Sequence, residues 1–247
     1  MRRVSLEVEK HDYKEKESAQ VKKMFSGIAP RYDLLNHLLS FGFDIGWRKK
    51  VALETGKIHC KRILDICTGT GDMAIELCKF WKGKAHIEAV DFSRELLKVG
   101  KNKSRKAGLS EKITFSEADA ESLPYEDEQF DAVTIVFGLR NIHDRLKALK
   151  EFYRVTKPGG CFICLEFSLP TNPIFARLYS FYLVKLVPVI SNLFGSNPDA
   201  YRYLGRTIRE FPTPLELVSL IKSAGWKDIL YYNLTGGIVA IHQGEKD

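Results

Sequence analysis

The sequence predicts an α/β fold in which a mostly parallel sheet carries helices on both faces. Between residues 62 and 167, short apolar runs alternate with stretches whose apolar residues recur at helical spacing. Strands separated by helices of about 10–15 residues form right-handed βαβ units, and such units build a parallel sheet. The last two strand-like runs are joined by only three residues, a connection so short that it allows only an antiparallel pair.

Each expected element follows from the local pattern of apolar and turn-forming residues. Apolar runs predict strands over residues 62–67, 86–90, 112–117, 130–137 and 161–167. Helical spacing predicts helices over residues 72–81, 93–107 and 145–155, the second with Ser93 as its N-cap. The run Lys157-Pro158-Gly159-Gly160 is expected to stop the third helix. A further helix over 214–224 precedes the terminal antiparallel pair, 226–234 and 238–242.

The remaining segments flank or interrupt this alternation. Residues 1–20 are expected to form a polar arm, and residues 21–58 a cap of N-terminal helices. Residues 170–212 hold aromatic, helix-like segments and are expected to form a helical lid. Residues 21–247 are predicted to be a single domain, because their length suits one core with an elaboration.

Composition excludes several classes of protein. Of 247 residues, 45% are apolar and 28% are charged, which is ordinary globular usage and not that of a disordered or fibrous chain. Five Cys, an odd number, do not form a disulfide framework, so a cytoplasmic location is expected. No secretory signal and no apolar run of about 18 residues is found. The net charge of +7 favours an anionic partner without identifying one.

A glycine-rich turn between the first strand and the first helix predicts a cofactor site. Gly69 and Gly71 let the backbone approach a ligand closely, and the helix N-terminus behind them favours negative groups. Asp91 follows Gly71 by 20 residues, at the end of the second strand, where a carboxylate can accept both hydroxyls of a ribose. With Ala74 the turn also fits the dinucleotide fingerprint, so NAD is one candidate cofactor. A bare strand–helix turn is the plainer interpretation.

Three features favour S-adenosylmethionine over NAD. Asp65 closes the first strand, where it could hold an ammonium group or order the turn. A second acid, Asp119, follows the third strand, where an adenine would lie. The chain ends in an antiparallel pair where a dinucleotide fold would have a sixth parallel strand. Together these features resemble class I methyltransferases, which have a Rossmann-like sheet and use S-adenosylmethionine.

Several longer strings narrow this resemblance. They are Tyr32-Asp33-x-x-Asn36-x-x-x-Ser40 with Trp47, Arg154-Val155-x-Lys157-Pro158-Gly159-Gly160 with Leu165-Glu166-Phe167-Ser168, Phe137-Gly138-Leu139-Arg140-Asn141, Tyr201-Arg202-Tyr203-Leu204, and Tyr231-Tyr232-Asn233-Leu234-Thr235-Gly236-Gly237. The sequence is similar, from about residue 22 onward, to the ubiquinone/menaquinone biosynthesis C-methyltransferases. It departs from their pattern at three positions. Members usually have Met where Leu35 stands and His where Asp44 stands, and many have Ser where Val136 stands.

The resemblance implies both a cofactor site and a substrate. The substrate would be a quinol with a polyprenyl tail, methylated on a ring carbon. The residues implied to bind S-adenosylmethionine are Thr70, Asp91, Asp119 and Ala120, beside Asp65, Gly69 and Gly71 of the turn.

Methylation of a ring carbon requires the neighbouring hydroxyl to lose its proton, and phenols titrate near pH 10. Arg140, just past the fourth strand, is the candidate for stabilising the phenolate, because an arginine stays charged and does not act as a base. Asn141 is expected to orient the ring oxygen, with Tyr32 and Asp33 reaching it from the N-terminal helix. The proton acceptor stays open between Asp33, His143 and a bound water. A surface salt bridge is the alternative role for Arg140.

Three further motifs have plainer interpretations. Cys161-x-x-Cys164 lies on an expected strand, where residues three apart face opposite sides, and the six His show no ligand spacing, so no metal is expected. The basic run over 94–106 predicts a solvated helix face, with contact to an anionic lipid or to RNA as the alternative. The apolar run 178–194 predicts packed helix, a lid over the prenyl tail, or peripheral contact with the inner face of a membrane.

Other functions stay open at the level of sequence. They are methyl transfer to another small molecule or to RNA, NAD binding, and a methyltransferase-like binding module without catalysis. Intact Asp91 and Asp119 count against the binding module. No nucleic-acid partner is expected, and the oligomeric state, a homodimer included, is not fixed by the sequence.

Overall fold

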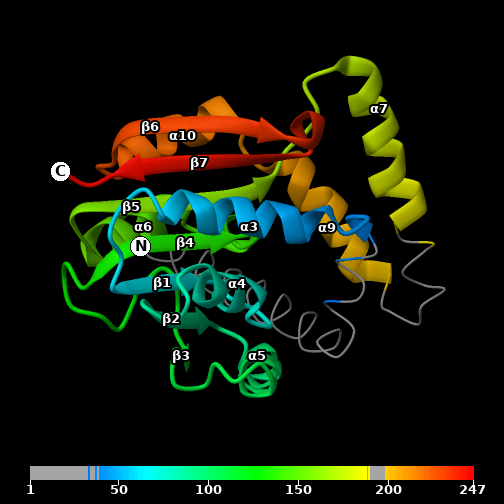
Figure 1. Cartoon of the computed structure of the whole chain (residues 1–247). Helices are drawn as coiled ribbons and strands as arrows, with labels where there is room; N and C mark the ends of the chain where they lie inside the picture. The colour runs from blue at the N-terminus through cyan, green and yellow to red at the C-terminus, as the bar shows by residue number, and fades with distance from the viewer. Residues whose placement is uncertain (1–32, 34–36, 38, 188, 190–197) are drawn as a thin grey trace, which may run out of the picture.

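The computed structural model describes residues 33, 37, 39–187, 189 and 198–247 (Figure 1). Its centre is a seven-stranded sheet in the order β3-β2-β1-β4-β5-β7-β6. The strands are β1 Arg62–Ile66, β2 His86–Asp91, β3 Ile113–Glu117, β4 Phe130–Val136, β5 Thr156–Phe167, β6 Lys227–Leu234 and β7 Val239–Glu245. Strands β1 to β5 are parallel, and β7 is antiparallel to both β5 and β6. The predicted parallel sheet with a terminal antiparallel pair is confirmed.

Helices cover both faces of this sheet. On one face lie α3 Phe43–Thr55, α4 Asp72–Phe80 and α5 Arg94–Lys106, and on the other lie α6 Arg145–Val155 and α10 Pro214–Ser223. The four helices α4, α5, α6 and α10 agree with the sequence prediction to within one residue at each end. Their apolar stripes account for this agreement, because each stripe is buried against the sheet.

Side-chain caps fix where several helices begin. The Ser93 hydroxyl accepts a hydrogen bond from Leu96 N–H at the start of α5, as the sequence predicts. Asp144 accepts from Lys147 N–H before α6. Thr213 forms a reciprocal capping box with Glu216 before α10. Each cap satisfies a backbone N–H that the helix leaves unpaired, a contribution of about 1 kcal/mol.

Strand β5 begins earlier than the sequence predicts. The expected start was residue 161, whereas β5 begins at Thr156 and includes the run that ends α6. Gly159 adopts φ +72°, and a Cβ on Gly160 would lie 2.8 Å from the Asp131 carbonyl oxygen. Lys246, after β7, supplies the partners, because it accepts from Gly159 N–H and donates to the Gly160 carbonyl. The prediction was wrong because the pairing comes from the far end of the chain.

Two apolar clusters fill the two faces of the sheet. Cys161 belongs to the cluster beneath α3 and α4, and Cys164 belongs to the cluster beneath α6 and α10. Their predicted opposite orientation is confirmed. The second cluster holds the fully buried rings of Phe162 and Trp226, whose centroids are 5.2 Å apart. Burial of each large apolar side chain contributes about 1.5–3 kcal/mol.

A third apolar cluster packs the insertion, residues 170–212, against α5 and the end of β5. The insertion contains α7 Pro173–Phe181, the π-helical turn η3 Tyr182–Leu186, and α9 Pro198–Glu210. Leu96 of α5 packs in this cluster with Tyr179, Leu183, Val187 and Ile208. Figure 1 shows α7 standing beyond the carboxyl ends of the parallel strands. The expected polar arm, Tyr32 and the rest of residues 21–32, 34–36 and 38 of the expected N-terminal cap lie outside the described residues.

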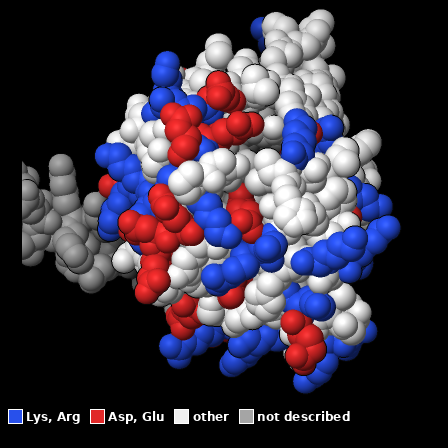
Figure 2. All heavy atoms as spheres, turned by 60° about the vertical axis from the view of Figure 1, so that its left-hand side comes forward, with Lys and Arg blue, Asp and Glu red and all other residues white. Residues whose placement is uncertain are grey.

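Charge and apolarity on the surface bear on the partners of the protein. On the face shown in Figure 2, Lys and Arg are interspersed with Asp and Glu. That face therefore lacks the single-sign basic stripe typical of nucleic-acid binding. Within the described ranges, no helix is long and apolar enough to cross a membrane.

Candidate active site

The glycine-rich turn follows β1 at the carboxyl edge of the sheet. Three of its residues have positive φ: Cys67 at +54°, Gly69 at +56° and Gly71 at +80°. A Cβ on Gly71 would lie 2.8 Å from the Phe115 ring, so this glycine allows the turn to pack on β3. A Cβ on Gly69 would meet nothing within 4 Å. Gly69 therefore leaves open space beside a backbone that a ligand can approach.

Asp65 is buried beneath this turn. Its carboxylate accepts hydrogen bonds from the Thr68 hydroxyl at 2.6 Å and from the Thr134 hydroxyl at 2.8 Å. Burial raises the pKa of Asp65 to about 6, against the lowering effect of these two hydrogen bonds. Of the two roles predicted for Asp65, these contacts correspond to ordering the turn.

Asp91 ends β2 and ties the turn to the start of α5. Its Oδ2 accepts from Gly69 N–H and its Oδ1 from Ser93 N–H, each at 2.9 Å. The side chain is buried, with the residue 4% exposed. The carboxylate therefore lies against the open Gly69 position, where the sequence places a ribose.

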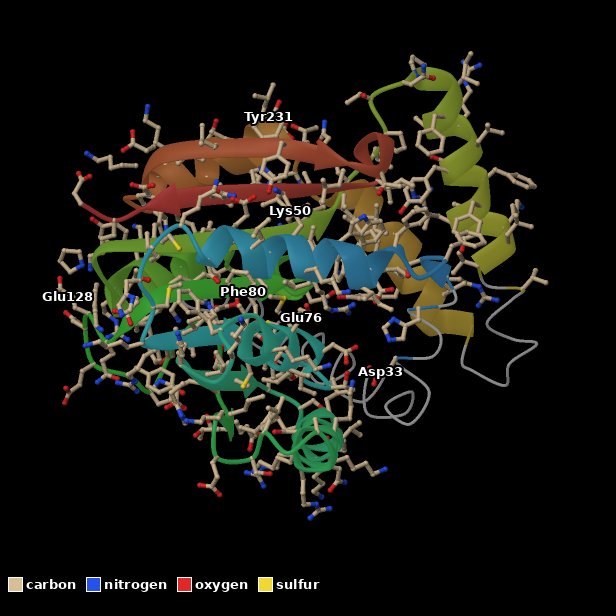
Figure 3. All side chains as sticks on the ribbon, viewed as in Figure 1. Asp33, Lys50, Glu76, Phe80, Glu128 and Tyr231 are labelled. Carbon is tan, nitrogen blue, oxygen red and sulfur yellow. The ribbon has the colours of Figure 1, made fainter. Side chains whose placement is uncertain are left out.

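Asp33 lies beside the turn. The Thr70 hydroxyl donates to Asp33 Oδ1, and Lys103 Nζ from α5 donates to Asp33 Oδ2 at 2.6 Å. Lys103 also pairs with Asp72, the first residue of α4. Figure 3 shows Asp33 at the carboxyl edge of the parallel strands, with Glu128 at the opposite edge. The structure thus brings Asp33 together with Thr70.

Asp119 and Ala120 follow β3 at the same edge. The Asp119 carboxylate accepts from Glu121 N–H at 2.8 Å, and the backbone of Asp119 forms an isolated bridge with Ser122. Ala120 is partly buried against the cluster beneath α6. The short bridge gives this loop a defined shape at the place predicted for adenine.

A cavity of about 390 Å³ opens next to this edge. Its walls are largely apolar and aromatic, and come from α3, β5, α7, η3 and α9, with Phe137 just after β4. The polar side chains that line it are Ser40, Asp44, Arg48, Arg140 and Thr235. Ser40 precedes α3, Asp44 and Arg48 lie in its first turns, and the other two belong to the short 3₁₀ turns η2 Leu139–Asn141 and η4 Thr235–Gly237. The lining residues that the structure describes in the insertion are apolar or tyrosine.

Arg140 lies in the wall of this cavity and is buried. Its Nη1 donates to Glu166 Oε1 at 2.8 Å and to the Phe137 carbonyl at 2.5 Å. Its guanidinium carbon lies 5.3 Å from the centre of the Phe167 ring. The alternative of a surface salt bridge is therefore wrong, because the ion pair is buried. Asn141 accepts from the Tyr203 hydroxyl at 3.2 Å and is not among the lining residues.

The family of the chain follows from its relatives. The model of the ubiE/COQ5 methyltransferase family matches residues 11–246. The chain belongs to the ubiE/COQ5 methyltransferase family. The ubiquinone/menaquinone biosynthesis C-methyltransferase UbiE of Geotalea uraniireducens is 42% identical over 92% of this chain and 96% of its own length. The demethylmenaquinone methyltransferase of Streptomyces avermitilis is 43% identical over 94% of this chain and 96% of its own.

Solved structures share the fold of this methyltransferase at low identity. The cyclase SpnF superposes with a TM-score of 0.67 and 18% identity over 93% of this chain and 96% of its own. An S-adenosylmethionine-dependent methyltransferase of Thermotoga maritima gives a TM-score of 0.62 and 21% identity over 91% and 99% of the two chains. These likenesses confirm the predicted Rossmann-like methyltransferase fold.

Some residues of this candidate site were not singled out from the sequence. Trp47 lines the cavity and donates from Nε1 to the Thr235 hydroxyl at 2.9 Å, across 188 residues of sequence. Arg48 lines it too, and Glu166 holds Arg140. Trp47 and Glu166 belong to the sequence motifs that the chain shares with its family. Those motifs do not indicate which residues contact one another in the fold.

Proposed function

We propose that this methyltransferase transfers a methyl group from S-adenosylmethionine to a ring carbon of a prenylated quinol, in menaquinone or ubiquinone biosynthesis. Relatives named for that activity are 41–43% identical over at least 92% of the chain. The main support for the proposal is the cavity, which has polar side chains on one part of its wall and apolar side chains on another. Its polar side chains suit a quinol ring, and its apolar wall along the insertion suits a hydrocarbon tail.

S-adenosylmethionine is the methyl donor, and it supplies an electrophilic methyl carbon on a positively charged sulfur. The turn fits such a ligand, since Gly69 offers open backbone. A carboxylate oxygen accepts more than one hydrogen bond, so Asp91 can hold ribose hydroxyls beside its two backbone donors. Asp119 and Ala120 would bind the adenine, and Thr70, held by Asp33, would complete the turn side of the site.

We assign Arg140 to the ring oxygen. Its buried Nε–H finds no acceptor within the described part of the chain, although its Nη1 has two. A fixed donor in a dry cavity stabilises negative charge as it develops on a phenolate. The contact with Tyr203 fixes the amide of Asn141, which we assign to orienting the ring. Tyr32 remains a candidate for the same task.

The insertion is assigned to the prenyl tail and to a membrane surface. Tyr179, Leu183 and Val187 face the cavity and are buried. Ile174 and Phe181 on the same segment are 71% and 58% exposed. A helix that is apolar on two sides can bury one side in the protein and the other at a lipid interface. The protein would then act peripherally at the inner face of the membrane, where a prenylated substrate resides.

The quinone pool of a deletion strain tests the proposed function. Mass spectrometry is expected to show accumulation of a quinone that lacks one ring methyl group. Re-expression of the wild-type chain should restore the methylated quinone, whereas an Asp91→Ala variant should not. An unchanged quinone pool in the deletion strain would contradict the proposal.

A further inference from the structure

Asp44 is the only carboxylate among the described residues that line the cavity. The other titratable side chains of its wall are two arginines and two tyrosines. Arginine does not act as a base. Burial raises the pKa of Tyr179 well above its usual range and that of Tyr182 to about 12, so both hydroxyls keep their protons at neutral pH. Of the described residues that line the cavity, Asp44 is therefore the one whose side chain is in the basic form.

Three donors hold the Asp44 carboxylate in place. The Ser40 hydroxyl donates to Oδ1 at 2.6 Å, and Arg48 Nη1 and His37 Nδ1 both contact Oδ2, the latter at 2.7 Å. Arg48 and His37 also approach Asp72 Oδ2 of α4, at 4.0 and 3.9 Å. Among the described residues, Oδ1 therefore has one hydrogen-bond partner and Oδ2 has two, which leaves Oδ1 a lone pair that can take a proton.

The candidates named from the sequence are less well placed. Asp33 is held by Thr70 and Lys103 beside the cofactor turn and does not line the cavity. His143 is exposed and does not line it either. Glu166 is committed to Arg140 and to two backbone N–H groups.

We propose that Asp44 is the catalytic proton acceptor, taking the proton of the ring hydroxyl on Oδ1 as the neighbouring ring carbon is methylated. The inference rests on the proposed function and names a residue for it that the comparisons do not assign. Two residues then act on the ring hydroxyl: Arg140 stabilises its oxygen, and Asp44 receives its proton.

The step balances in atoms and electrons. The ring carbon forms a bond to the methyl carbon with a π-electron pair of the ring, and the pair of the broken methyl–sulfur bond stays on sulfur. The O–H bond breaks at the same time, its proton moves to Asp44, and its electron pair forms the ring carbonyl. The methylated carbon then loses its hydrogen to water as a proton. The oxygen regains the proton from Asp44, which ends ionised as it began.

The environment of Asp44 explains why the two events are coupled. Burial opposes its ionisation, but the hydrogen bond from Ser40 and the charge of Arg48 outweigh it and hold the pKa of Asp44 below its usual range. Such a carboxylate is a weak base towards a neutral phenol. The hydroxyl becomes far more acidic as the ring gives up electron density to the incoming methyl group, so transfer becomes favourable during bond formation.

Asp44→Asn tests the inference, because it preserves size but removes the basic oxygen. Turnover of a reduced, prenylated demethylnaphthoquinol at pH 7 is expected to fall by about 10²–10⁴. The residual rate should rise about tenfold per pH unit up to the phenol pKa near 10, because the hydroxyl then ionises unaided. Affinity for S-adenosylmethionine, measured by calorimetry, should stay native.

Glu54→Gln is the matched control. Glu54 is a buried carboxylate on the same helix that pairs with Lys50 and Lys57 and does not line the cavity, so native turnover and pH dependence are expected. Asp44→Ala assayed with added formate covers the case in which Asp44→Asn misfolds. A small carboxylate should restore its rate in proportion to formate concentration.

The outcomes separate the inference from the proposed function. Near-native turnover of a folded Asp44→Asn variant, or no response of Asp44→Ala to formate, would overturn the role of Asp44 and leave quinol methylation standing. A wild-type protein that methylates no prenylated quinol would overturn both.

Discussion

Arg140 and Glu166 form a buried ion pair in the cavity wall, with 2.8 Å between Arg140 Nη1 and Glu166 Oε1. Arg140 comes from η2 after β4, and Glu166 comes from the end of the neighbouring strand β5. The glutamate also accepts the backbone N–H groups of Arg140 and Phe167, at 3.1 and 2.9 Å. Loss of either partner would leave a charge buried and unpaired, so stability and chemistry at Arg140 need separate tests.

Arg140→Met alone is expected to destabilise the protein by about 3–5 kcal/mol, because Glu166 is left charged and buried. The double variant Arg140→Met/Glu166→Gln should recover most of this loss while still lacking the guanidinium. Its turnover should fall by about 10²–10³, since one preorganised donor to the phenolate is missing. Urea denaturation measures the first effect and single-turnover kinetics the second. Native turnover of the double variant would make Arg140 purely structural.

Asp91→Ala is expected to weaken binding of S-adenosylmethionine at least tenfold, about 1.4 kcal/mol. The variant loses the proposed ribose acceptor, and it also removes the acceptor of the Gly69 and Ser93 N–H groups. Titration calorimetry with the purified protein measures the affinity. Asp127→Ala is a suitable control, because this exposed acid pairs with Arg154 away from the turn. Unchanged affinity, or preferential binding of NAD, would contradict the cofactor assignment.

Stability should depend on pH through Asp65. Burial raises its folded-state pKa from the ordinary aspartate value of 3.8 to about 6, so the folded chain keeps a proton that the unfolded chain has lost. This contribution to stability is present below about pH 4 and is lost as the pH rises through 6. Asp65→Asn mimics the protonated form. The free energy of unfolding of Asp65→Asn minus that of the wild type should therefore rise by about 2–3 kcal/mol between pH 4 and pH 7.

Urea denaturation at pH 4 and pH 7 checks this expectation. Wild type and Asp65→Asn should differ more at pH 7 than at pH 4. An equal difference at both pH values would mean that Asp65 titrates in the folded chain as it does in the unfolded chain.

The exposed apolar side of the insertion should bind lipid. Replacing Ile174 and Phe181 by Ser removes two exposed apolar side chains without touching the cavity wall. Each contributes up to about 1.5–3 kcal/mol when fully buried, so flotation with phospholipid vesicles should fall at least tenfold. Leu215→Ser, at a 65% exposed site on α10, is the control. Equal flotation of all three proteins would exclude this surface as the membrane contact.

Tail length offers a second measure of the same segment. The KM for quinols should fall as the tail lengthens, because more of the chain is buried against Tyr179, Leu183 and Val187. If KM does not change with tail length, these side chains serve only to pack the core.

The parts of the site that are local in sequence were predictable. Gly69, Gly71 and Asp91 are fixed by one βαβ unit, whose strand and helix periods place the turn and the acid at the same edge. Arg140 was predictable for the same reason, since it directly follows a buried strand.

The cavity was not predictable, because its walls meet only through tertiary packing. Trp47 reaches Thr235, and Tyr182 reaches the Leu39 carbonyl at 2.7 Å, across more than a hundred residues in each case. The pairing of Arg140 with Glu166 likewise depends on the register of β4 against β5. No spacing along the chain carries that information. Asp44 shows how little the sequence indicates about the cavity. It differs there from the residue usual in the family, and no pattern places it in a cavity wall.

Every role proposed for these residues serves methyl transfer to a ring carbon of a prenylated quinol. The most direct measurement incubates the purified protein with a reduced prenylated demethylquinol and S-adenosylmethionine whose methyl group is fully deuterated. The expected product carries the trideuteromethyl group on a ring carbon, located by mass spectrometry and NMR. Label on a quinol oxygen, or label absent from every prenylated quinol offered, would rule out ring-carbon methylation as the reaction of this protein.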